Sequence, residues 1–144
     1  MGTRTMKTGL GMLILCGCVL LIDGPSSAED RPSVDCEDAV TQADINQCAD
    51  LEYQEADKAL NEQWARTKEV LAGWDADIDA PNRGAVADLT KAQRAWITYR
   101  DAQCDATGYS VWGGSLYQAV ILGCLARVTR NRTTELKELA EGVE

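Results

Sequence analysis

The residues able to do chemistry in this chain are mostly carboxylates. Of 144 residues, 23 are Asp or Glu and none is His. Without an imidazole the chain has no Ser–His or Cys–His pair and lacks the usual proton shuttle of neutral pH. Acid pairs at helical spacing, such as Glu52 with Glu55 and Asp101 with Asp105, could serve a glycoside hydrolase as acid and base. An acidic helical protein produces such pairs by chance, and the sequence therefore favours a protein that is not an enzyme.

A short acidic turn imitates the start of a calcium-binding loop. Asp75, Asp77 and Asp79 have the spacing of the first three ligands, but Ala80 replaces the required glycine and Val86 replaces the bidentate glutamate. A zinc site is not expected either, because the chain has no histidine and no C-x-x-C pair. We therefore predict neither a metal nor a cofactor.

The start of the chain is typical of a secretory signal peptide, which we predict over residues 1–28. Arg4 and Lys7 provide a basic start, residues 10–22 are almost wholly apolar, and small residues precede the expected cleavage site. The apolar run is too short for a stable membrane span. A lipid anchor at Cys18 is the alternative, because the residues around it resemble a lipobox. The apolar run continues past Cys18, which favours export as a periplasmic or secreted protein without an anchor.

The mature chain, residues 29–144, has the length of one domain. It keeps an even number of cysteines: Cys36, Cys48, Cys104 and Cys124. In an exported chain these predict two disulfides, and spacing alone leaves three pairings open. The net charge of the whole chain is −9, which argues against a nucleic-acid partner, because phosphates need Lys and Arg. The charge suits a basic protein partner, although an acidic surface also serves solubility alone.

Three amphipathic helices are expected along the mature chain, and the first begins at a capping box of Thr41 and Asp44. Its apolar residues recur at steps of three and four, which predicts one buried stripe. The stripe comprises Ile45, Ala49, Tyr53, Ala56, Leu60, Trp64, Thr67 and Leu71. Gly73 is expected to end the helix.

The second helix is expected over residues 85–106. Its expected inner side comprises Leu89, Ala92, Trp96, Tyr99 and Gln103. The third helix is expected over residues 116–139, with Ser115 as its N-cap and its apolar front half as the most enclosed segment. No strand pattern and no internal repeat is present. The sequence therefore predicts an all-α fold, a small antiparallel three-helix bundle with room for extra short helices, stapled by two disulfides.

One stretch of the second helix gathers polar and aromatic residues. Its members are Arg94, Trp96, Tyr99, Arg100 and Asp101. An arginine that packs its stem on aromatic rings while its guanidinium reaches a carboxylate can join two helices. We expect the two aromatic residues to face the core and the three charged residues to hold neighbouring helices. Asn61 and Gln93 are expected to form interhelical hydrogen bonds, because buried polar groups need partners.

Three motifs follow one another along the mature chain. Besides the cysteines, their residues are Asn46, Tyr53, Asp57, Asn61, Gln93, Arg94, Trp96, Arg100, Asp101, Gly114 and Arg132. In this order they resemble the LprI-like family, whose segment of this kind is called the lysozyme inhibitor LprI N-terminal domain. The resemblance covers nearly the whole mature chain, and we expect the motif residues to be structural.

The resemblance implies an exported α-helical domain with a defined disulfide pairing. The implied pairs are Cys36–Cys48 and Cys104–Cys124. It also implies that the protein inhibits a lysozyme. Lysozymes are typically basic, so an acidic protein would be steered toward them.

The loop of residues 108–115 offers contact residues for such a partner. Tyr109 and Trp112 are the best anchors, since aromatic residues often carry binding energy. Trp112 could instead cover the end of the bundle. A periplasmic interaction or envelope-stress module with another protein partner is the alternative function.

Overall fold

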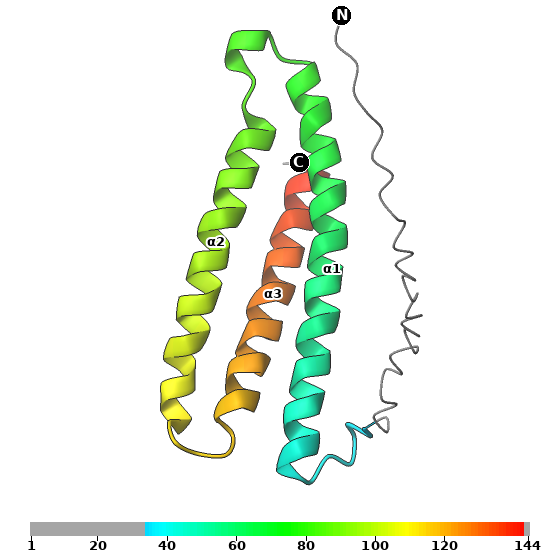
Figure 1. The fold of residues 1–144 in the computed structure, drawn as a ribbon. Helices are drawn as coiled ribbons and strands as arrows, with labels where there is room; N and C mark the ends of the chain where they lie inside the picture. Colours follow the sequence, from blue (N-terminus) through cyan, green and yellow to red (C-terminus); the bar gives the residue numbers. More distant parts are fainter. Residues whose placement is uncertain (1–33, 143–144) are drawn as a thin grey trace, which may run out of the picture. The chain divides into compact units, whose positions relative to one another are not determined.

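The chain folds into three long helices that run in alternating directions (Figure 1). The structure is a computed structural model that describes residues 34–142. The helices are α1 (Gln42–Ala76), α2 (Ala85–Gly108) and α3 (Tyr117–Glu141). Two short 3₁₀ helices, η1 (Ala80–Asn82) and η2 (Tyr109–Val111), lie in the connections. The predicted all-α three-helix bundle with extra short helices is therefore confirmed.

The predicted signal peptide and the alternative lipid anchor at Cys18 lie outside the described residues, and both stay predictions. Within residues 34–142, none of the helices is both long and apolar enough to cross a membrane.

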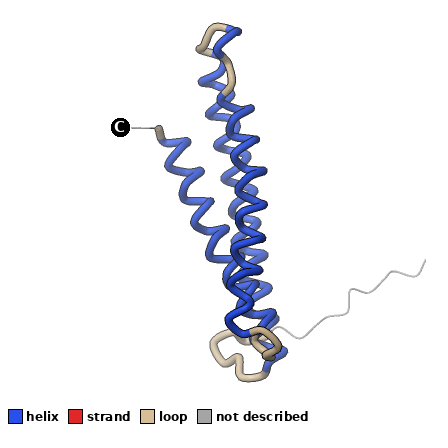
Figure 2. The backbone as a smooth tube through the Cα atoms, turned by 90° about the vertical axis from the view of Figure 1, so that its left-hand side faces the viewer, coloured by secondary structure: helices blue, strands red, loops and turns tan. Residues whose placement is uncertain are grey.

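The helices α1 and α2 form one layer, and α3 lies against one side of it. Figure 1 shows α1 and α2 flanking α3, and Figure 2, turned by 90°, shows α3 displaced to one side of the overlapping pair. The helix α3 packs most extensively against α1 and less against α2, whereas α1 and α2 contact each other least. The side of the α1–α2 pair that faces away from α3 is therefore the less covered one.

The helix α1 begins where the sequence predicts and ends later than expected. The Oγ1 atom of Thr41 accepts a hydrogen bond from the backbone N–H of Asp44 at 3.1 Å and donates one to its Oδ2 at 2.6 Å. The predicted N-cap is thus confirmed. The reciprocal half of the capping box is not formed, because Oδ2 of Asp44 accepts from the hydroxyl of Thr41 instead of its backbone N–H. The expected stop at Gly73 is wrong, because the helix continues to Ala76.

The extra turn of α1 places Asp75 where its carboxylate caps α2. The carboxylate accepts hydrogen bonds from the backbone N–H groups of Gly84 and Ala85, both at 2.9 Å, and of Val86 at 3.1 Å. These bonds, with that of Val86 the strongest influence, hold the pKa of the Asp75 carboxyl below its ordinary value. The turn that imitates a calcium loop therefore acts as a helix cap. No group of three or more potential metal-ligating side chains occurs in the described part of the chain.

The end of α2 packs directly against α3. The helix continues past the expected end to Gly108, where the backbone has an ordinary helical φ of −58°. A Cβ atom at this position would lie 2.8 Å from Cγ1 of Ile121, so the glycine is needed for the close approach rather than for its flexibility. The expected N-cap at Ser115 is wrong, because α3 begins at Tyr117 and its N-cap, Leu116, makes no side-chain capping bond.

The core consists of two apolar clusters that share Trp96. The buried members of the first are Leu60, Leu71, Leu89 and Leu136. Those of the second are Cys104, Cys124 and Val128. The indole of Trp96 packs against both clusters, so its predicted inward position is confirmed.

The most enclosed part of α3 is its middle rather than its front half. Leu116 is 44% exposed, and Ile121 and Leu122 are only half-buried. By contrast, Ala126 and Thr129 are fully buried. The expectation of an enclosed front half is therefore wrong, because burial along α3 is greatest over residues 124–129 and again at Leu136.

A hydroxyl group links α1 to α3 inside the core. The side chain of Thr67 is fully buried, and its Oγ1 lies 2.9 Å from the backbone oxygens of both Gln63 and Leu136. It also accepts a hydrogen bond from Nε2 of Gln63 at 3.1 Å. Because the hydroxyl has one proton, it donates to one of the two carbonyls at a time. The bond to Leu136 fixes the position of α3 along the axis of α1.

Both disulfides implied by the family resemblance are present. They join Cys36 to Cys48 and Cys104 to Cys124, and we call them the N-terminal disulfide and the α2–α3 disulfide. Both lie at the same end of the bundle, where α1 begins and α2 connects to α3 (Figure 1). We call this region, residues 34–48 and 104–124, the disulfide end.

Candidate functional site

Three motif residues of α1 lie one turn apart beside a shallow hollow. Tyr53, Asp57 and Asn61 line a depression of about 700 Å³ together with neighbouring residues of α1. Within it, Nδ2 of Asn61 donates a hydrogen bond to Oδ2 of Asp57 at 2.9 Å. The expected interhelical hydrogen bond of Asn61 is therefore wrong, since its partner lies on the same helix.

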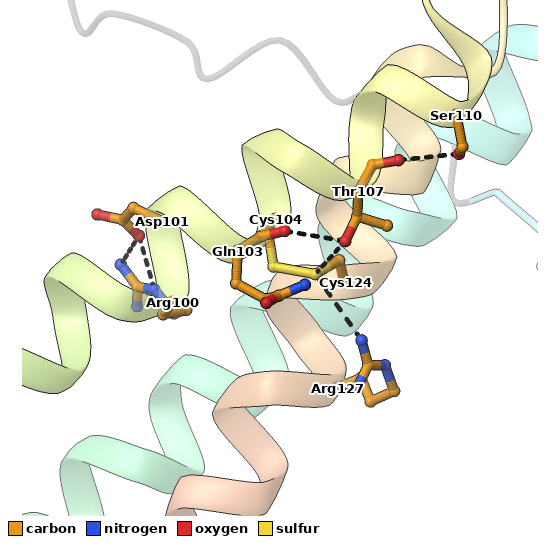
Figure 3. Close-up of a disulfide and its surroundings, with 8 residues drawn as sticks. All are labelled: Arg100, Asp101, Gln103, Cys104, Thr107, Ser110, Cys124 and Arg127. Atoms are coloured by element: carbon orange, nitrogen blue, oxygen red, sulfur yellow. Dashed lines mark hydrogen bonds and ion pairs between the residues drawn. A yellow bond between two sulfur atoms is a disulfide. The ribbon is translucent and has the colours of Figure 1, made fainter.

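Arg100 of α2 lies between two aromatic rings. Its guanidinium carbon is 5.8 Å from the ring centre of Tyr53 on α1 and 5.2 Å from that of Trp96 on α2. Its Nε and Nη2 atoms both lie 2.8 Å from Oδ1 of Asp101 (Figure 3). Burial raises the pKa of the Tyr53 hydroxyl, and the positive charge of Arg100 opposes that increase. Arg100 contacts α1 through the ring of Tyr53, as predicted. The expectation that Asp101 joins α2 to another helix is wrong, since its ion-pair partner Arg100 lies on α2.

Gln93 and Arg132 link α2 to α3. The Nε group of Arg132 donates a hydrogen bond to Oε1 of Gln93 at 3.0 Å, and its Nη1 pairs with Oε2 of Glu135 at 2.8 Å. The side chain of Arg132 is only 14% exposed, so these two acceptors satisfy a mostly enclosed cation. The expected interhelical hydrogen bond of Gln93 is confirmed.

The remaining motif residues have local roles. Oδ1 of Asn46 accepts a hydrogen bond from Nε2 of Gln42 at 3.0 Å, within the first turns of α1. The backbone N–H of Gly114 donates to the backbone oxygen of Val111 at 2.9 Å and closes a turn. Arg94 is exposed and lines a second hollow between α1 and α2, of about 280 Å³. Its side chain makes no hydrogen bond or ion pair with residues 34–142, so its predicted link to another helix is wrong.

The inner side of α2 agrees with the predicted one at Leu89 and Trp96 and differs from it at Ala92, Tyr99 and Gln103, which are exposed. The residues that are buried or half-buried on this helix include Leu89, Gln93, Trp96, Arg100 and Cys104. Tyr99 is 58% exposed, and the expectation that it faces the core is wrong. Arg100 takes the inner position, because its charge is balanced there by Asp101 and by the faces of two aromatic rings.

The connection between α2 and α3 carries an exposed aromatic cluster. The rings of Tyr109 and Trp112 are stacked at 5.2 Å with an interplanar angle of 14°. Tyr117 meets Trp112 edge to face, also at 5.2 Å. The side chains of Tyr109 and Trp112 are 67% and 66% exposed. Trp112 therefore leaves most of its surface to solvent instead of covering the end of the bundle. We call Tyr109, Trp112 and Tyr117 the aromatic turn.

Sequence reasoning missed two members of these arrangements. Tyr117 was not expected in the aromatic turn, although its position at the start of an apolar helix, five residues after Trp112, was a usable signal. The role of Asp75 as a cap for α2 was also missed, because the bonded residues follow it only after a loop.

The candidate acid pairs are each partly engaged by arginine. Oε2 of Glu52 lies 3.1 Å from Nη2 of Arg130, and Asp101 holds Arg100. These ion pairs give the two carboxylates structural partners on or between the helices.

The fold and its surface define a small, all-α, disulfide-stapled protein whose most exposed aromatic residues gather at one end. The family model described as lysozyme inhibitor LprI matches residues 35–136. The chain therefore belongs to the LprI lysozyme inhibitor family. An uncharacterized protein of Rhizobium meliloti (strain 1021) is 42% identical over 144 residues, which cover 98% of this chain and 99% of the relative. No solved structure matches the chain.

Proposed function

We propose that this protein is exported into the bacterial envelope, where it binds a basic lysozyme and restrains its activity without being an enzyme itself. The observation that carries the proposal is the family match over residues 35–136. The two disulfides support export, because such bonds persist in oxidising compartments and are rare in the cytosol.

The distribution of charge supports a basic partner. The net charge of the chain is −9, and every charged residue from Asp35 to Asp57 is acidic. An electrostatic field of one sign attracts a partner of opposite charge and raises the rate of association, most strongly at low ionic strength.

The residue types support binding rather than catalysis. The chain has no histidine, and one member of each candidate acid pair is held by an arginine. A hydrolase acting through two carboxylates would need one of them as an acid and the other as a base or nucleophile, with the sugar between them. Pairs that lie on one helix, with one member ion-paired, fit a surface role better.

The test is a titration of the oxidised protein into a basic lysozyme that is clearing a peptidoglycan suspension. We expect the rate of clearing to fall as the protein is added, and the inhibition to weaken as salt is raised from about 0.01 M to 0.15 M, because the Debye length shortens over that range. Absence of inhibition together with absence of binding at low salt would refute the proposal and favour an envelope module with another partner. Clearing by this protein alone would favour a glycan hydrolase.

A further inference from the structure

The aromatic turn stands out from the rest of the described surface. Tyr109 and Trp112 are more exposed than any other aromatic side chain in residues 34–142, and Val40, at the same end of the bundle, is 84% exposed. Trp112, Gly113, Gly114 and Tyr117 line a hollow of about 340 Å³ beside the stacked rings. Large apolar side chains that gather on a surface mark interaction sites more often than scattered ones do.

The centre of this surface is uncharged. No charged residue occurs between Asp105 and Arg127, a stretch that includes the whole α2–α3 connection. Protein interfaces share this composition, since their cores are depleted in charge and enriched in Tyr and Trp, with a polar rim around them.

Carboxylates surround this uncharged centre. Figures 1 and 2 both place the start of α1 at the same end as the α2–α3 connection. Glu37 and Asp38 are exposed in the segment before α1, and Asp105 is exposed near the end of α2. Two arginines of the neighbouring helix turns are neutralised by acids, Arg100 by Asp101 and Arg130 by Glu52. Arg127 is exposed beside the α2–α3 disulfide and makes no ion pair with residues 34–142, so the rim is predominantly acidic and includes this cation (Figure 3).

The aromatic turn is held in one conformation by its own backbone. Trp112 N–H donates to the oxygen of Tyr109 at 3.3 Å, and Tyr117 N–H donates to that of Gly114 at 3.2 Å. The hydroxyl of Ser110 donates to the oxygen of Thr107 at 2.8 Å, next to the α2–α3 disulfide (Figure 3). A surface that is ordered before binding loses less conformational entropy on association.

We propose that the disulfide end is the surface that docks the basic partner. Tyr109 and Trp112 enter an uncharged recess of that partner, and the carboxylates around them face its Lys and Arg residues. The proposal rests on the proposed function for the identity of the partner, and it adds the site of contact. The partner we propose is a cationic protein of the lysozyme class, because the rim is predominantly acidic and the centre is aromatic.

The first experiment compares two tryptophans at opposite ends of the bundle. Trp112→Ala, alone and with Tyr109→Ala, is matched by Trp74→Ala, because Trp74 is also an exposed tryptophan, at 38%, but lies near the far end of α1. Binding of each oxidised variant to a basic lysozyme is measured by calorimetry at fixed salt. We expect Trp112→Ala to weaken binding about thirty-fold or more, as for a hot-spot aromatic residue, and Trp74→Ala to leave it within about two-fold.

The second experiment reverses equal charges at the two ends. Glu37→Lys with Asp38→Lys changes the acidic rim, and Asp77→Lys with Asp79→Lys makes the same change in charge at the far end. The near-end variant is expected to lower the association rate about ten-fold more than the far-end variant at low salt, with convergence of the two at high salt. Thermal melts of all variants show whether each remains folded. We expect the variants at Tyr109, Trp112 and the four acids to melt close to the parent because these side chains are exposed, and Trp74→Ala to melt somewhat lower because most of the Trp74 surface is covered.

The outcomes separate the two proposals. If the parent protein binds and the near-end variants bind as well as the far-end ones, the docking surface is wrong and the proposed function stands. If the parent neither binds nor inhibits a basic lysozyme, both proposals fail. Weakened binding by near-end variants that melt like the parent supports both.

Discussion

Replacing Gly108 with alanine is expected to destabilise the bundle, although alanine is the better helix former. A Cβ atom there would lie 2.8 and 2.9 Å from Cγ1 and Cδ1 of Ile121 and 3.0 Å from Cε2 of Tyr117. Carbon atoms pack comfortably at about 3.5–4.0 Å, so the neighbours must move by about 0.7 Å. Overpacking of this kind costs about 1–3 kcal/mol. Alanine returns about 1 kcal/mol through helix propensity, so we expect a net loss of up to about 2 kcal/mol.

The control is a second glycine with free space around it. Gly123 lies within α3, and a Cβ there would meet nothing within 4 Å. Gly123→Ala should therefore be neutral or stabilising by up to about 1 kcal/mol, through helix propensity and the reduced freedom of the unfolded chain. The two substitutions are chemically identical and are expected to act in opposite directions.

The measurement is thermal or urea unfolding of the oxidised protein, with the midpoint shifting about 4 °C per kcal/mol for a domain of this size. Removing side-chain bulk with Ile121→Ala in the Gly108→Ala background should recover part of the packing strain, which a double-mutant cycle isolates as a coupling energy of about 0.5 kcal/mol or more. An increase in the midpoint for Gly108→Ala, similar to that for Gly123→Ala, would show that α2 and α3 do not approach as closely as the structure has them.

Three further changes test other contacts. Asp75→Asn should lower the midpoint, because an amide oxygen accepts more weakly than a carboxylate from the three N–H groups that start α2. Folding lowers the pKa of Asp75, so its carboxylate stabilises the folded protein fully above the unfolded pKa near 3.8. That contribution is lost as the pH falls through the folded pKa, and the melting midpoints of the parent and the variant should therefore converge in acid. The N-terminal disulfide should be reduced before the α2–α3 disulfide, because Cys36 is exposed whereas Cys104 is fully buried. Mass spectrometry after graded reduction and alkylation reports the order of reduction, and the reverse order would contradict the prediction. Gln93→Ala should cost about 1.5–3 kcal/mol in urea unfolding, since it removes an acceptor from the mostly enclosed Arg132, and a loss below about 0.5 kcal/mol would mean that Glu135 alone satisfies the cation.

The spacing of apolar residues predicted the three helices, because it shows which side of each helix is apolar. The stripe of α1 from Ala56 to Leu71 is buried as predicted, apart from a half-buried Trp64. The same reasoning failed on parts of α2. After Trp96, a step of three leads to Tyr99 and a step of four leads to Arg100, so both fit a helical period, and hydrophobicity favoured the wrong one. A charged residue takes the inner position there because partners from two helices surround it, and those partners are unknown until the helices are placed.

Helix ends were predicted less well than helix faces, for a related reason. The cap at Thr41 is local, and its bonding residue follows within one turn. The end of α1 was misplaced at Gly73, because the sequence did not reveal that Asp75 reaches across the connection to α2. The start of α3 was misplaced at Ser115 because the turn is closed by backbone bonds of Val111 and Gly114 rather than by a side-chain cap.

Tests of function should therefore concentrate on the aromatic turn, because the motif residues that identify the family and the residues available for binding lie in different places. Trp96, Arg100 and Gln93 are engaged in contacts within the bundle, and replacing them would change stability first. Tyr109 and Trp112 leave two-thirds of their surface in water, where the fold gains little from them. Full burial of a large apolar side chain would contribute about 1.5–3 kcal/mol. Solubility alone does not explain why two large aromatic side chains of an ordered turn stay mostly in water. Burial against a partner would provide the stabilisation that the fold does not obtain from them.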